Sequence, residues 1–103
     1  MVIKARGELI TPTDQVNLTV QFRDQLGQAV DADSFPTISI VQPNGTILLA
    51  PTTQGVAHTG VGQYSYIFTA GINPAFGIYN DIWTGSINGF QVQSTFNFLI
   101  NKL

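Results

Sequence analysis

Residues 77–100 read GIYNDIWTGSINGFQVQSTFNFLI, and this stretch decides the fold. Asn88 and Gly89 lie between two apolar alternations, and both tolerate the positive φ of a type I′ hairpin turn. With the turn placed there, the predicted cross-strand pairs are Ile87–Phe90, Gly85–Val92, Trp83–Ser94, Asp81–Phe96 and Tyr79–Phe98. Side chains alternate along a strand, so all these residues share one face. That face carries most of the large apolar groups, and we predict that it forms the inner wall of a β-sandwich.

The rest of the chain shows the same short-period pattern. Strands are predicted at Gln15–Arg23, Pro36–Val41, Thr46–Ala50, Val56–His58 and Gly62–Ala70, with turns such as Gln42-Pro43-Asn44-Gly45 between them. No segment of about ten residues combines helix formers with a 3.6-residue period. The sequence therefore predicts an all-β, antiparallel sandwich of seven to eight strands.

Residues 1–11 stand apart from the sandwich domain, which we place at 12–103. Pro12 separates the two because it has no N–H for a β-ladder. We expect an N-terminal arm or an edge strand here. Lys4, Arg6 and Glu8 carry charges of both signs, which suits the segment to pairing with a neighbouring subunit. If it is an arm, deleting residues 1–10 should leave a folded sandwich and weaken assembly.

Length and composition exclude several classes of protein. The chain has 103 residues, enough for one domain, and no cysteine, so it has neither disulfide nor thiolate chemistry. No secretory signal or membrane-spanning run is visible, and we expect neither secretion by that route nor a membrane partner. Four Lys and Arg residues are too few for a nucleic-acid footprint, so no nucleic-acid partner is expected.

Charge is scarce and unevenly distributed. Charged residues make up 10% of the chain, and between Ser34 and Asn101 the only formal charge is Asp81. Either this is an ordinary Thr/Asn/Gln-rich sandwich surface, or other subunits cover it, since interface cores are depleted in charge. We favour the second alternative. The candidate protein-contact residues are the outer row of the last strand and the charged N-terminal residues, namely Gln91, Gln93, Thr95, Asn97, Lys4, Arg6 and Glu8.

The sequence contains no signature of catalysis or metal binding. Nucleophile-elbow, phosphate-loop and zinc patterns are missing, and the single histidine, His58, gives little scope for a triad or a zinc site. Asp24, Asp31 and Asp33 fit a solvated acidic loop better than a calcium site, because the Gly and Glu of an EF-hand loop are lacking. We expect no enzyme activity, cofactor or bound metal. Four aromatic residues are expected in the core rather than on a sugar-stacking platform, namely Tyr64, Tyr66, Tyr79 and Trp83.

Asp81 is the most unusual residue, because it lies on the predicted inner face. An unpaired buried carboxylate is costly. We expect either that a bulge turns it outward or that it bonds to nearby backbone or hydroxyl groups such as Ser94. An ion pair with Lys4 or Arg6, or a functional role, is the less favoured alternative.

Several motifs together resemble the C-terminal half of an immunoglobulin-like domain. They are Gly62-Gln63-Tyr64-Ser65-Tyr66-Ile67-Phe68, Gly77-Ile78-Tyr79, Ile82-Trp83-Thr84-Gly85 and Ser94-Thr95-Phe96-Asn97-Phe98. The cadence is similar to that of filamin-type and related bacterial repeats and covers about residues 15–100. The resemblance implies that Tyr79 forms a tyrosine corner, in which its hydroxyl bonds to upstream backbone. Asp81 stands where disulfide-bearing relatives have a cysteine.

The chain also resembles the small virion proteins of tailed bacteriophages, which are single charge-poor domains without an export signal. The resemblance implies a structural protein, made in the host cytoplasm and located in the virion. It would decorate or cement the capsid as a homo-oligomer or within a large assembly of virion subunits. A neck or tail component is the alternative within that class, and a carbohydrate- or host-surface-binding module is the alternative outside it.

Overall fold

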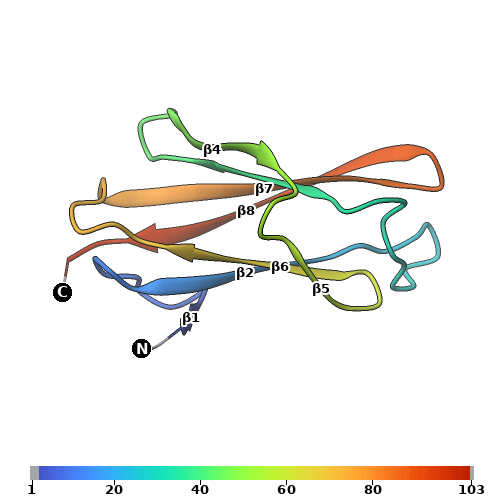
Figure 1. Cartoon of the computed structure of the whole chain (residues 1–103), viewed down its shortest axis with the longest axis horizontal. Helices are drawn as coiled ribbons and strands as arrows, with labels where there is room; N and C mark the ends of the chain where they lie inside the picture. The colour runs from blue at the N-terminus through green and yellow to red at the C-terminus, as the bar shows by residue number, and fades with distance from the viewer. Residues whose placement is uncertain (1–2, 103) are drawn as a thin grey trace.

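The structure is a computed structural model, and it describes residues 3–102. Eight strands form two four-stranded sheets that stack as a two-layer sandwich (Figure 1). The strands are β1 (Ile3–Ala5), β2 (Gln15–Gln21), β3 (Thr37–Val41), β4 (Ile47–Thr52), β5 (Ala57–Gly60), β6 (Gln63–Thr69), β7 (Gly77–Ile87) and β8 (Phe90–Ile100). One sheet has the order β1-β2-β6-β5 and the other β4-β3-β7-β8. The predicted all-β architecture is confirmed, and the pairs between neighbouring strands are antiparallel as predicted except for β1–β2, which is parallel. The described residues contain no helix that could span a membrane.

The β7–β8 hairpin has the predicted register. Ile87 pairs with Phe90 and every later pair follows without a shift, as far as Gly77 and Ile100. Asn88 and Gly89 have φ values of 52° and 84°, as a type I′ turn requires. Local turn chemistry therefore sets the pairing of the two longest strands.

The core lies between the sheets and is built from alternate residues of the strands. Its largest fully buried side chains include Trp83, Tyr79 and Phe98 from the hairpin. The facing sheet contributes Val16 and Leu18, as the alternation in this strand predicts. Phe90, on the same face of the hairpin as Trp83, is 70% exposed, because it is the first residue after the turn.

The turn between β3 and β4 forms as predicted, whereas β4 is longer than predicted. Gly45 has a φ of 89° and donates its N–H to the Gln42 carbonyl at 2.9 Å. β4 continues through Pro51 to Thr52, beyond the predicted end at Ala50. Proline fits there because β4 is an edge strand, and an edge strand needs no N–H on its open side.

The N-terminal residues are part of the sandwich. β1 pairs with β2 at the edge of its sheet, so the edge-strand alternative describes residues 3–5. Further along, Ile10 is fully buried and forms a bridge to Ile100 of β8. Deleting residues 1–10 would remove this core side chain, so we expect such a truncation to destabilise the sandwich.

Candidate functional site

The outer row of β8 is exposed along an open sheet edge. Gln91, Gln93, Thr95 and Asn97 point away from the core, and β8 is the last strand of the sheet order β4-β3-β7-β8. Among the described residues, the side chains of these four residues make no hydrogen bond. They form an uncharged surface strip, which we call the β8 edge row.

The backbone of the same four residues also faces outward. In a two-residue hairpin the pair beside the turn, Ile87 and Phe90, exchanges both hydrogen bonds, and bonded pairs then recur at every second position. The β8 edge row occupies the alternate positions, so its N–H and C=O groups point away from β7. Leu99 lies two positions after Asn97, so its backbone groups should also point away from β7. Its carbonyl does so, since it accepts the Ile10 N–H at 3.1 Å on the open side. No other described backbone group bonds to this side of β8 between Gln91 and Asn97.

The charged N-terminal residues do not join this strip, because each bonds within the N-terminal region or to the core. The Lys4 ammonium lies 2.8 Å from Asp14 and donates to the Leu9 carbonyl at 2.9 Å. Glu8 accepts the Ala5 N–H at 3.0 Å. Lys4, followed by the Thr11 hydroxyl and N–H, lowers the pKa of Asp14 to about 2. These residues brace the turn after β1, and they do not form a charged arm.

Arg6 binds Asp81, and this overturns the favoured expectation for that carboxylate. Asp81 is fully buried, and β7 runs past it with no bulge and no hydrogen bond to Ser94. The Arg6 Nη2 and Nε atoms donate to the two carboxylate oxygens at 2.6 and 3.2 Å. The Trp83 indole N–H donates to the same carboxylate at 3.1 Å. Every buried polar side-chain atom in the described residues has a partner, so this buried charge is compensated.

The acidic loop residues Asp24 and Asp31 bind different partners and do not share one site. Asp24 accepts the N–H groups of Leu26 and Gln28 within its own turn. Asp31 accepts the Gly62 N–H at 2.7 Å and lies 2.9 Å from His58. The Gly62 N–H, and after it His58, lowers the pKa of Asp31. Between residues 3 and 102, no three His, Cys, Asp or Glu side chains group as a metal site would need.

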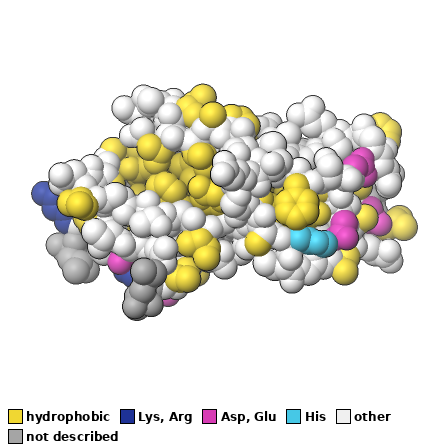
Figure 2. All heavy atoms as spheres, in the orientation of Figure 1, with side chains coloured by type: hydrophobic (Ala, Val, Ile, Leu, Met, Phe, Trp, Pro, Cys, Tyr) yellow, Lys and Arg dark blue, Asp and Glu magenta, His cyan; other side chains and the backbone are white. Residues whose placement is uncertain are grey.

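His58 lies on the open edge of β5, exposed, and stacks on Tyr64 with ring centroids 4.8 Å apart. Figure 2 shows the single histidine beside an acidic side chain on the surface. The imidazole therefore covers the ring of Tyr64 and pairs with Asp31.

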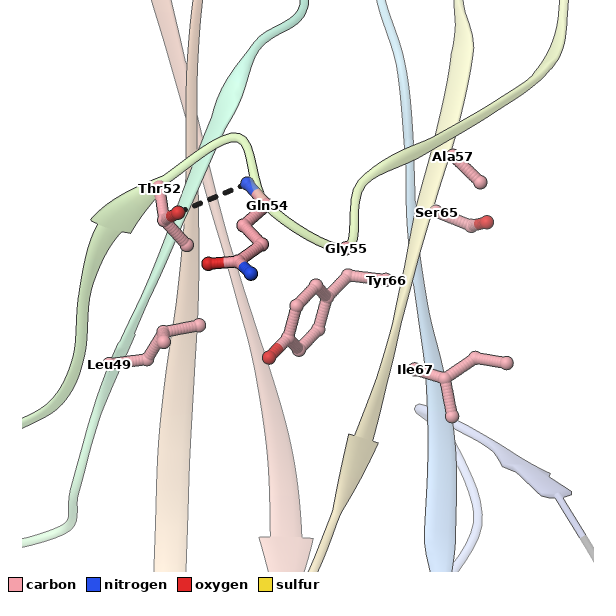
Figure 3. Close-up of a pocket in the computed structure, with 8 residues that line it drawn as sticks. All are labelled: Leu49, Thr52, Gln54, Gly55, Ala57, Ser65, Tyr66 and Ile67. Carbon is pink, nitrogen blue, oxygen red and sulfur yellow. Dashed lines mark hydrogen bonds between the residues drawn. The ribbon is translucent and has the colours of Figure 1, made fainter.

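Three of the four aromatic residues considered for sugar stacking are in the core. Tyr64, Tyr79 and Trp83 are buried, as expected, whereas Tyr66 is half-buried. The Tyr66 ring faces a hollow of about 450 Å³ between β4 and β6 (Figure 3). Figure 2 shows hydrophobic side chains gathered between the sheets on the side of the molecule that carries β4. The hollow is lined by Leu49, Thr52, Gln54, Gly55, Ala57, Ser65, Tyr66 and Ile67.

Sequence reasoning missed one residue that shapes the hairpin. Asp33 accepts the Asn88 N–H at 3.0 Å on one oxygen and the Gly89 N–H at 2.9 Å on the other. Its own N–H donates to the Ser86 carbonyl at 2.8 Å. The β2–β3 loop thus holds the tip of the hairpin. No local pattern in the sequence links position 33 to position 88, which lies 55 positions further on.

Comparison of the chain with protein-family models, with curated proteins and with solved structures found no match.

Proposed function

We propose that this chain is a non-enzymatic assembly subunit, most simply a capsid decoration or cement protein of a tailed-bacteriophage virion. The observation that carries the proposal is the β8 edge row, whose four residues turn both side chains and free backbone groups outward on an uncharged, open strand. Exposed edge strands are the usual template for adding a strand from another chain. The partners are other virion subunits.

The charge pattern of the second sheet supports the same proposal. β3, β4, β7 and β8 contain one charged residue, Asp81, and it is fully buried. The outer face of this sheet therefore carries no formal charge. Because charge is depleted in the cores of interfaces, this is the face that we assign to neighbouring subunits.

An immunoglobulin-like topology is part of the proposal. The sheet orders β1-β2-β6-β5 and β4-β3-β7-β8 correspond to the A-B-E-D and C′-C-F-G sheets of such domains. The Tyr79 hydroxyl donates to the Ala75 carbonyl at 2.7 Å, which is the bond of a tyrosine corner. At the position where disulfide-bearing relatives have a cysteine, the Arg6–Asp81 ion pair connects the N-terminal segment to β7.

The mechanism is passive. A rigid sandwich that is copied many times on a shell turns one weak strand contact into a strong multivalent attachment. The chain is made in the host cytoplasm and acts in the virion; a neck or tail position would use the same edge.

Fractionation of the native source tests the proposal. Lysate is separated on a density gradient, and an antibody against the chain locates it by immunoblot and by immunogold electron microscopy. We expect the chain to sediment with particles in many copies and to remain there after a salt wash. A chain found only in the soluble fractions would overturn the proposal.

A glycan- or host-surface-binding module is the second candidate, and the hollow at Tyr66 favours it. An aromatic ring beside Thr52 and Gln54 combines a stacking surface with hydrogen-bonding groups. Binding of neutral oligosaccharides to the isolated chain, abolished by Tyr66→Ala and kept in Ile78→Ala on the other sheet, would support the module. Ile78 is exposed and is not among the residues that line the hollow, which makes it a suitable control.

A further inference from the structure

We propose that the partner of the β8 edge is β8 of a second copy of this chain. The two strands would pair antiparallel about a two-fold axis, and the two β4-β3-β7-β8 sheets would continue into one. This inference rests on the proposed function in one respect, that β8 is the assembly edge; it adds which partner occupies that edge and in which register.

The free part of the edge has defined limits. At one end, the Asn88-Gly89 turn closes the hairpin. At the other end, the Ile10 N–H donates to the Leu99 carbonyl, and the Ile10 carbonyl accepts the Asn101 N–H at 2.9 Å. Between these limits the outward-facing backbone groups belong to the β8 edge row, Gln91 to Asn97. A pairing strand must fit this window.

The window is symmetric about Ser94, and this selects the register. If Ser94 lies on the two-fold axis, Gln91 faces Asn97 of the second copy and Gln93 faces Thr95. All four residues then form bonded pairs, each of which exchanges both N–H···O bonds. Shifting the copies by two residues would leave an outward-facing group of the window unpaired. The same strand of two copies is therefore self-complementary, as a two-fold interface requires.

Nothing on the strand opposes this approach. Natural edge strands avoid self-pairing with lysine, proline or a bulge, and β8 contains none of these over its eleven residues. Two copies meet without like charges, because β8 has no charged residue. In this register Phe90, which is 70% exposed, faces Phe98 of the second copy, and Val92 faces Phe96. The contact therefore also removes apolar surface from water. A strand-to-strand contact of this length is small, so we expect dimerisation that rises with concentration.

Cysteine cross-linking tests the register, because the chain has no cysteine of its own. Opposed residues in a non-bonded antiparallel pair have Cα atoms about 4.5 Å apart, within reach of a disulfide. Mild oxidation of Ser94→Cys should therefore give a covalent dimer on a non-reducing gel. Asn97→Cys is the matched control: it lies on the same strand, but its copy would be roughly 20 Å away. Equal cross-linking of both variants, or of neither, would overturn the proposal. Preferential cross-linking of Gln93→Cys or Thr95→Cys would overturn the Ser94 register.

Sedimentation of unmodified and charged variants provides a second measurement. Gln93→Lys with Thr95→Lys places like charges opposite each other in the dimer, and we expect it to stay monomeric across a concentration series in which the wild type dimerises. Asn17→Lys with Thr53→Lys adds the same charge at exposed positions away from β8 and should dimerise like the wild type. A wild-type chain that stays monomeric, or a Lys pair that dimerises as well as the wild type, would overturn the inference.

The two proposals fail in different ways. A chain that binds particles but shows neither dimer nor Ser94→Cys cross-link would refute the second copy as partner and leave the assembly function standing. A chain that dimerises through Ser94 but never enters a particle would refute the assembly function alone.

Discussion

Arg6 and Asp81 lie 75 positions apart in the chain and form a two-bond ion pair at the edge of the core. The same guanidinium donates to the Thr19 carbonyl of β2 at 2.7 Å and lies 4.3 Å from the centre of the Phe96 ring on β8. One side chain therefore contacts both sheets. Among residues 3–102 it pairs with the one fully buried carboxylate, and it links β2 to β7 and β8.

Removing Arg6 should destabilise the fold strongly, because Asp81 would be left buried and unpaired. We expect Arg6→Ala to lower the free energy of unfolding by about 3 kcal/mol in urea denaturation. Arg6→Met with Asp81→Asn should recover much of that loss, since it removes both charges and keeps an acceptor for the Trp83 indole. Arg23→Ala, in an exposed turn, should change stability by no more than about 0.5 kcal/mol. An Arg6→Ala variant as stable as Arg23→Ala would contradict this account.

The Lys4–Asp14 pair should make stability depend on pH in the acid range. The pKa of Asp14 is about 2 in the folded chain, against 3.8 for an ordinary aspartate, so the folded state favours the carboxylate. Its contribution is complete above about pH 4 and is lost as the pH falls through about 2. We expect the melting temperatures of wild type and Asp14→Asn to differ by a constant amount from pH 5 to 7. The difference should shrink between about pH 4 and pH 2, and a gap that persists at pH 2 would rule out this cause.

Asp33 should control the order of the hairpin tip. Asp33→Ala leaves the Asn88 and Gly89 N–H groups without acceptors, and we expect a loss of about 1 kcal/mol, as for a lost helix cap. Asp33→Asn keeps one acceptor oxygen and should lie between the alanine variant and the wild type. Amide hydrogen exchange at residues 88 and 89 measures the effect directly. If exchange there is unchanged in Asp33→Ala, the loop does not hold the turn.

Gly62 should be far less replaceable than Gly45, although both have positive φ. A Cβ at Gly62 would lie 2.6 Å from the Val30 carbonyl oxygen and 2.7 Å from that of Phe22, whereas one at Gly45 meets nothing within 4 Å. Gly45→Ala should therefore show only the strain of left-handed backbone, about 1–2 kcal/mol. Gly62→Ala should lose about 3 kcal/mol or more by urea denaturation. Equal losses in the two variants would mean that the loops relax around the new methyl group.

The candidate contact surface was predictable in part. The exposure of Gln91, Gln93, Thr95 and Asn97 follows from the hairpin register, and the register follows from two turn residues. The open edge did not follow, because a strand's place in a sheet depends on which other strands lie beside it. The intramolecular partners of Lys4, Arg6 and Glu8 did not follow either, because they are set by how the N-terminal segment folds back.

The sequence by itself determined what short-range rules control. Period-two alternation set the strands and their inward faces, and Asn88-Gly89 set the pairing of β7 with β8. Only the tertiary structure decided which residues from distant parts of the chain meet, namely Arg6 with Asp81, Asp33 with the hairpin tip, and Ile10 with Ile100. Turn and strand preferences act over a few residues. A buried charge, in contrast, takes whichever counter-ion the packing of two sheets brings to it, and no local pattern records that choice.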